Sequence, residues 1–166
     1  MKKALGLIDS ISEWSGKIVS FLVIAFTLVI LYEVIARYVF NSPTIWAQEV
    51  SVALYGVYIV LIGAYVLRIG QHVNVDIIYN RFPPRIRAAV NLFTWLLFFL
   101  WVGTLIWKGW QSGWSSFLVR EREPTTFGLP VYPVKLCIPV GAFLLFLQGL
   151  ATYIRNAVFA VTGKEL

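Results

Sequence analysis

Cysteine, histidine and charge are scarce in this sequence. Cys137 is the only cysteine and His72 the only histidine among 166 residues. One cysteine excludes an intramolecular disulfide, and we interpret Cys137, which lies in an apolar run, as a packing residue. One histidine excludes a bis-histidine haem. His72 and Asp76 are four residues apart, but catalytic metal sites need at least three protein ligands. We therefore expect no metal and no cofactor.

Catalytic groupings and polar surface are missing as well. Serine and threonine occur without a partner base, so no nucleophilic triad is indicated, and we predict that the chain is not an enzyme. Charged residues make up 13% of the chain and hydrophobic residues 59%, which is too apolar for a soluble domain of this length. The basic residues cluster beside apolar runs, which indicates contact with membrane lipids and argues against binding of nucleic acid.

Long uncharged apolar runs predict the fold. They cover residues 18–32, 50–67, 88–107 and 136–154. About 20 helical residues cross a hydrocarbon core of about 30 Å, and backbone polar groups in lipid must pair internally. We predict an all-α integral membrane protein with a single membrane domain over residues 1–166 and four transmembrane helices, at about 17–39, 46–67, 86–107 and 133–154. No small-residue cleavage site follows the first run, so we expect that span to be retained.

Three polar or mixed segments are predicted as short interfacial amphipathic helices, at about 4–16, 72–82 and 108–118. In the first segment Ile11 and Trp14 share one helical face, and Asp9 and Ser12 lie on another. The tryptophans of the third segment are typical of the aromatic belt at the outer membrane surface.

The basic residues also predict the orientation. Nine lie on one side of the predicted spans: Lys2, Lys3, Lys17, Arg68, Arg81, Arg85, Arg87, Arg155 and Lys164. Five lie on the other: Arg37, Lys108, Arg120, Arg122 and Lys135. Because cytoplasmic loops carry the excess of Lys and Arg, we expect both termini to be cytoplasmic and the chain to lie in the bacterial inner membrane.

Ionisable residues gather at the outer ends of the first two spans. Glu33 and Arg37 are four residues apart, so they share a helical face and can pair. The link at residues 41–44 (NSPT) indicates a turn with a helix N-cap at Ser42 or Thr44, and it brings Arg37 within reach of Glu49. Two interpretations stay open: handling of protons or cations, or a structural ion pair at a subunit seam.

The centres of the four spans carry no charge. The chief polar side chains there are Thr27, Tyr58, Thr94 and Gln148. A self-sufficient ion-coupled carrier binds its solute and ion through polar groups at mid-depth. The pattern therefore indicates a scaffold or accessory subunit, with the moving parts in another protein.

Several motifs follow one another in an order that resembles a known family. The run RYVFNSP at residues 37–43 is followed by Trp46 and Glu49, and RIGQHVNVD occupies residues 68–76. Two prolines and Arg85 follow at residues 83–85, and Pro130, Tyr132, Pro139 and Gly141 surround the start of the fourth span. From about Ile8 to about Ile154, the chain resembles the small membrane subunit, of the DctQ type, of tripartite ATP-independent periplasmic (TRAP) transporters.

The resemblance implies a role and partners. In such transporters a periplasmic substrate-binding protein captures an organic anion or related solute and docks on two membrane subunits. The large, DctM-type subunit carries solute and sodium, and the small one braces it as a stator without a cofactor of its own. The resemblance and the helix-end positions together predict structural or subunit-interface roles for Glu33, Arg37, Asn41, Pro43, Trp46, Glu49, Arg68, Gly70, His72 and Asp76.

Two other functions are compatible with four spans in a short chain. The first is a stand-alone exporter working as an oligomer, for which Glu33 is the only fair candidate for a membrane-embedded carboxylate. The second is a membrane anchor subunit of a respiratory enzyme, against which the single histidine argues. Transport by the purified chain alone would favour the first, and a haem spectrum the second. The identity of the solute is not encoded in any recognisable feature.

Overall fold

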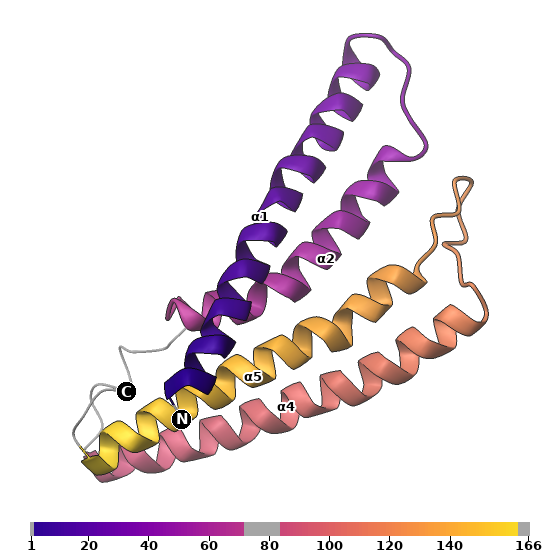
Figure 1. Cartoon of the computed structure of the whole chain (residues 1–166). Coiled ribbons are helices and arrows are strands. Elements are labelled where there is room, and N and C mark those ends of the chain that lie inside the picture. Colours follow the sequence, from indigo (N-terminus) through magenta and orange to yellow (C-terminus); the bar gives the residue numbers. More distant parts are fainter. Residues whose placement is uncertain (1, 72–83, 163–166) are drawn as a thin grey trace.

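The computed structural model describes residues 2–71 and 84–162. Within these residues the chain is helical, apart from loops and an isolated β-bridge between Arg122 and Pro130. Four helices are long and apolar enough to cross a membrane, which confirms the predicted fold class. They are α1 (Lys2–Tyr38), α2 (Ala47–Arg68), α4 (Pro84–Leu118) and α5 (Tyr132–Thr162) (Figure 1).

Three of the helices are longer than the spans predicted for them: α1, α4 and α5, the last of which ends at Thr162 instead of about residue 154. Residues 4–16 continue without a break into the first span as α1, and residues 108–118 extend the third span as α4. At 1.5 Å per residue α1 is about 55 Å long and exceeds a hydrocarbon core of about 30 Å. The interfacial position of its first turns stays a prediction, and the segment predicted at 72–82 lies outside the described residues.

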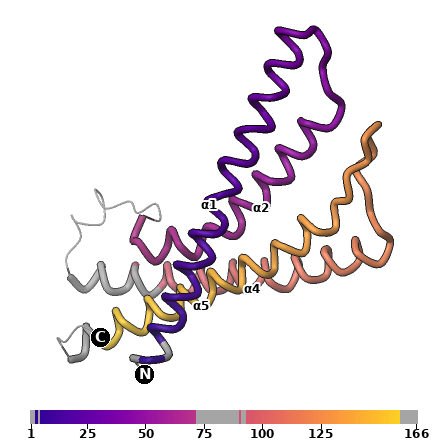
Figure 2. The backbone as a smooth tube through the Cα atoms, turned by 45° about the horizontal axis from the view of Figure 1, so that its top comes forward, coloured from indigo at the N-terminus to yellow at the C-terminus, as the bar shows by residue number. Residues whose placement is uncertain are grey.

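The helices pack in the order α1, α2, α5, α4. The extensive contacts join α1 to α2, α2 to α5 and α5 to α4, and a smaller contact joins α1 to α5. The helix pair α1–α2 and the helix pair α4–α5 meet near the start of α1 and the end of α5 (Figures 1 and 2). From there α1 and α4 diverge. Helix α5 is thus the central element, and the first and last described residues, Lys2 and Thr162, lie at the same end of the molecule (Figure 1).

Small residues allow the helix axes to approach closely. A Cβ atom on Gly16 of α1 would overlap the ring of Tyr65 on α2, and one on Gly141 of α5 would overlap the carbonyl oxygen of Val60 on α2. Ala64 and Ala151 are fully buried. Because lipid tails are as apolar as leucine, such close packing is the main source of helix association in a membrane.

The amphipathic start of α1 turns its polar face toward the other helices. Ser12 is 1% exposed, whereas Ile11, Trp14 and Ile18 on the opposite face are 49%, 67% and 62% exposed. This arrangement suits a lipid environment, in which apolar side chains face outward and polar ones find partners inside the protein.

Candidate functional site

Polar side chains form a cluster where α1 crosses α5. Ser12 Oγ donates a hydrogen bond to Gln148 Oε1 at 2.7 Å, and Gln148 Nε2 donates to Asp9 Oδ1 at 3.1 Å. Arg155 donates to both carboxylate oxygens of Asp9, at 3.1 and 2.5 Å. Gln148 is 0% exposed. A buried polar group left without a partner costs about 1–3 kcal/mol, so this cluster favours one register of α1 on α5.

Ion pairs beside this cluster tie α1 to α2. Glu13 accepts a hydrogen bond from Lys17 Nζ at 2.8 Å and another from Arg68 Nη1, also at 2.8 Å. The side chains of Arg68 and Glu13 are 29% and 37% exposed, so solvent screens the pair and its contribution to stability is small. We call Asp9, Ser12, Glu13, Arg68, Gln148 and Arg155 the crossing cluster.

Sequence reasoning missed the crossing cluster as a unit. It placed Asp9 and Ser12 on the polar face of an interfacial helix, listed Gln148 among polar residues at mid-depth, and gave Arg155 no role beyond topology. A signal was present, because Asp9 and Arg155 have opposite charges and an even number of spans brings both chain ends to one side. The register that pairs them depends on packing between distant helices.

A second group of polar residues surrounds the link between α1 and α2, with the Glu33 carboxylate at its centre. Arg37 donates to Oε1 through Nε at 3.0 Å and through Nη2 at 2.5 Å. The backbone N–H of Thr44 donates to Oε2 at 3.1 Å, and the hydroxyl of Thr44 donates to the same oxygen. This confirms the predicted pairing of Glu33 with Arg37. We call Glu33, Arg37 and Thr44 the turn cluster.

The predicted N-cap at Ser42 or Thr44 is wrong. Helix α2 begins at Ala47, and its N-cap residue, Trp46, makes no side-chain capping hydrogen bond. The Thr44 hydroxyl donates to the Glu33 carboxylate instead of capping the helix, because a hydrogen bond to a charged carboxylate is stronger than one between neutral groups. The turn itself is confirmed: Asn41 has a φ of 50°, a left-handed conformation that asparagine tolerates better than most residues.

The expected contact of Arg37 with Glu49 is replaced by two separate contacts. Among the described residues Arg37 pairs with Glu33, while Glu49 Oε2 accepts a hydrogen bond from the backbone N–H of Leu129 at 3.2 Å. Glu49 therefore joins the first turn of α2 to the loop between α4 and α5.

That loop, residues 119–131, folds back on itself. Glu123 N–H donates to Leu129 C=O at 2.9 Å, and Val131 N–H donates to Glu121 C=O at 3.0 Å. Lys135 Nζ donates to Glu121 Oε2 at 2.6 Å. This hydrogen bond holds the pKa of the Glu121 carboxyl below its usual range. The loop is thus held in a defined conformation by these hydrogen bonds.

The other predicted site residues are spread over both ends of the molecule. Trp46 stacks on Tyr32 with ring centroids 5.8 Å apart, and Asn41 and Pro43 are exposed in the link. Gly70, with a φ of 69°, lies two residues after the end of α2; its N–H donates to Leu67 C=O, and the next N–H donates to Val66 C=O. Such a terminus favours glycine. His72 and Asp76 lie outside the described residues.

Three of the four polar side chains predicted at mid-depth, those of Tyr58, Thr94 and Gln148, have hydrogen-bond partners or ring contacts within the chain. The amide of Gln148 is bonded to Ser12 and Asp9, and Thr94 Oγ1 donates to the Val90 carbonyl of its own helix at 2.8 Å. The ring of Tyr58 packs edge-on against Phe26. Across residues 2–71 and 84–162, no three His, Cys, Asp or Glu side chains gather as a metal site would require.

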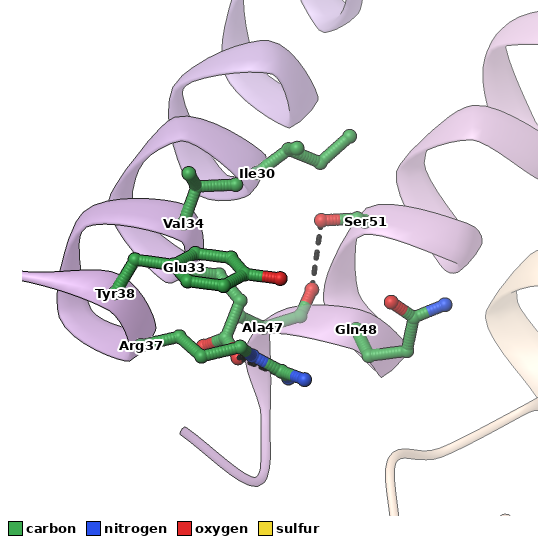
Figure 3. Close-up of a pocket in the computed structure, with 8 residues that line it drawn as sticks. All are labelled: Ile30, Glu33, Val34, Arg37, Tyr38, Ala47, Gln48 and Ser51. Carbon is green, nitrogen blue, oxygen red and sulfur yellow. Dashed lines mark hydrogen bonds and ion pairs between the residues drawn. The ribbon is translucent and has the colours of Figure 1, made fainter. Parts of the chain in front are cut away.

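A pocket of about 250 Å³ lies at the other end of the molecule from the crossing cluster, between the last turns of α1 and the first turn of α2. Arg37, Tyr38 and Gln48 line it (Figure 3). Apolar side chains of α1, Ile30 and Val34, form another part of its wall. The pocket is therefore amphipathic, and it lies at the end of two spans rather than at their middle.

Comparison with known proteins gives one family. The family model described as "Tripartite ATP-independent periplasmic transporters, DctQ component" matches residues 26–158. The C4-dicarboxylate TRAP transporter small permease protein DctQ of Vibrio cholerae serotype O1 is 33% identical over 123 residues, which are 74% of this chain and 51% of that protein. The sialic acid TRAP transporter small permease protein SiaQ of the same organism is 25% identical over 128 residues, 76% of this chain and 72% of that protein.

A further relative is much longer than the region it shares. The sialic acid TRAP transporter permease protein SiaT of Haemophilus influenzae is 34% identical over 102 residues, which are 61% of this chain but 16% of that protein. The chain thus spans about half of one of these three relatives and a small part of another.

Proposed function

This chain belongs to the DctQ component family of tripartite ATP-independent periplasmic transporters, and we propose that it is the stator subunit of a sodium-coupled importer of an organic anion. Its family and its four apolar helices make it a multi-pass protein of the bacterial inner membrane. In our proposal both termini are cytoplasmic, the large DctM-type subunit carries the solute and sodium, and a periplasmic binding protein delivers the solute.

One observation carries this proposal: among the described residues, no charged side chain lies near the middle of a span. Gln148, the largest fully buried side chain, is bonded to Ser12 and Asp9. A carrier would need polar groups there that can exchange their partners for solute and ion. The matched region of SiaT is a small part of a longer permease protein, which supports a role beside a larger membrane partner.

We assign the turn cluster and Glu49 to the fold of the outer end and to the seam with the large subunit, together with Asn41, Pro43 and Trp46. Arg68 and Gly70, with His72 and Asp76, take the corresponding role at the other end of α2. Glu33 and Arg37 suit a structural role because each is bonded to a neighbour and neither lies near the middle of a span. The interpretation as a proton or cation site is less well supported, because both Glu33 oxygens are already occupied by donors.

Assembly tests the stator role. The affinity-tagged chain, expressed with the large subunit encoded beside it, should retain that subunit through purification. Arg37→Gln and Glu49→Ala should lower the yield of the complex, whereas Glu123→Ala, which removes an exposed carboxylate from the same end, should not. Normal assembly and uptake with both variants would show that the seam does not depend on these residues.

Docking of the binding protein is a separate part of the proposal. Residues 41–45 and 108–132 would face it, and Arg120 and Arg122 are exposed in that region. A photo-crosslinker at position 120 or 122 should capture the binding protein in the assembled transporter, and the same crosslinker at the lipid-facing position of Ile18 should not. Failure at both loop positions would contradict the assignment of the docking surface.

A further inference from the structure

The pocket between α1 and α2 has a polar part and an apolar part. Arg37 and Gln48 stand at its polar part, and Tyr38 extends from α1 toward α2 (Figure 3). Ile30 and Val34, about two turns and one turn before the end of α1, are 48% and 45% exposed. Because both helices are candidate spans that end or begin here, this boundary between polar and apolar walls lies where the headgroup region of a membrane would be.

Arg37 has donor capacity left over in this pocket. Its Nε and Nη2 donate to Glu33 Oε1, and its side chain is 53% exposed. Within the described residues Nη1 makes no hydrogen bond. Glu33 is saturated, because Arg37 occupies one oxygen and Thr44 the other. The ion pair therefore fixes the guanidinium group and leaves one edge of it directed at a further acceptor, and a planar guanidinium suits phosphate.

We propose that this pocket binds a phospholipid of the adjacent membrane leaflet through its phosphodiester group. The phosphate accepts hydrogen bonds from the free edge of Arg37 and from the side-chain amide of Gln48. An acyl chain lies against Ile30 and Val34. A carboxylate on a soluble partner protein fits less well, because it would leave this apolar wall uncovered. The inference concerns the chain alone and does not depend on the proposed transport role.

Native mass spectrometry of the purified chain in detergent tests this, with phosphatidylglycerol as the probe. The wild-type chain should retain one phosphatidylglycerol molecule more tightly than any others. Arg37→Gln should weaken that site by about tenfold, the loss expected for one charge-assisted hydrogen bond. Gln48→Leu leaves the turn cluster intact and should also weaken the binding of phosphatidylglycerol. This variant therefore tests the proposal if Arg37→Gln fails to fold.

Matched controls come from α4. Lys108→Gln removes a cation and Gln111→Leu removes an amide, both from exposed positions outside the pocket, and neither should change the tight site. Equal losses with these controls would mean non-specific attraction and would overturn the proposal. Displacement of the lipid by inorganic phosphate or glycerol phosphate would identify a site for free anions instead. In membranes that contain the chain without the large subunit, a photo-crosslinker at position 48 should capture lipid, and capture of protein instead would identify a protein interface and overturn the proposal.

Discussion

Gln148 of α5 accepts a hydrogen bond from Ser12 of α1 at a point where both side chains are removed from solvent and lipid. The two residues are 136 positions apart in the sequence. The same amide donates to Asp9, so one glutamine connects a hydroxyl group to an ion pair. This relationship adds a few polar contacts at one end of the molecule to the close packing that holds the helices together.

Gln148→Leu should lower the free energy of unfolding by roughly 1–3 kcal/mol, because it leaves Ser12 Oγ buried without an acceptor and removes a donor to Asp9. Unfolding in mixed micelles, followed by circular dichroism, measures this. Gln111→Leu replaces an exposed glutamine of α4 and should change stability by less than about 0.5 kcal/mol. Equal effects of the two substitutions would contradict the importance given to the buried amide.

Asp9 and Arg155 should be energetically coupled. Their side chains are 21% and 31% exposed, so removal of either partner leaves a partly desolvated charge. In a double-mutant cycle of Asp9→Asn and Arg155→Gln, the pair should show a coupling energy of roughly 1 kcal/mol, within the range known for polar contacts between membrane helices. The free energy of unfolding of the four proteins is the readout. Additive effects would mean that the two side chains do not interact.

Gly141→Ala should separate α5 from α2, because the new methyl group would overlap the carbonyl oxygen of Val60. Overpacking of this kind costs about 1–3 kcal/mol, and we expect a lower melting temperature in detergent. Gly103 on α4 has open space where a Cβ atom would lie. Gly103→Ala should therefore be neutral or stabilising by up to about 1 kcal/mol. A Gly141→Ala variant as stable as Gly103→Ala would rule out the close approach.

Glu49→Ala should loosen the loop between α4 and α5. The backbone N–H of Leu129 loses its acceptor, so its amide hydrogen should exchange with solvent about tenfold faster, which corresponds to about 1.4 kcal/mol. Hydrogen exchange read by mass spectrometry covers residues 119–131. Glu123→Ala removes an exposed carboxylate from the loop itself and should leave the exchange unchanged. Unchanged exchange in Glu49→Ala would show that the loop is held by its own contacts alone.

The ion pair of Glu121 with Lys135 predicts a pH dependence. The native pKa of Glu121 is lowered by Lys135, whereas the unfolded carboxyl titrates at its ordinary value. The pair therefore contributes to stability above the ordinary glutamate pKa, and this contribution is lost as the pH falls through the lowered native pKa. Lys135→Gln should raise the pKa of Glu121 toward its ordinary value in an NMR titration of the carboxyl carbon. An unchanged pKa of Glu121 would mean that Lys135 does not pair with it in solution.

The parts of the fold that depend on local sequence could be predicted. Apolar runs of sufficient length predicted the four helices because lipid leaves the backbone no other partner. The pairing of Glu33 with Arg37 followed from their spacing on a helix, and the turn followed from the residue types at positions 41–44, which are common in turns. These predictions need only residues within one or two turns of each other.

The parts that depend on packing between distant helices could not be predicted. The register of α1 on α5 brings Asp9 to Arg155 across 146 positions, and no local pattern encodes that register. The acceptor of Leu129 N–H is Glu49, 80 positions away, so the contact expected between Glu49 and Arg37 did not form. Thr44 was predicted as a cap from residue type alone, but a nearby carboxylate was the stronger acceptor.

Solute uptake by proteoliposomes tests the central claim most directly: that these four helices offer no transport path and work only beside a larger subunit. Liposomes carrying the chain alone should take up no labelled C4-dicarboxylate or sialic acid under an inward sodium gradient. Liposomes carrying it with the large subunit should take up the cognate organic anion when the binding protein is added. Sodium-driven uptake by the chain alone, with no second protein in the membrane, would contradict the account.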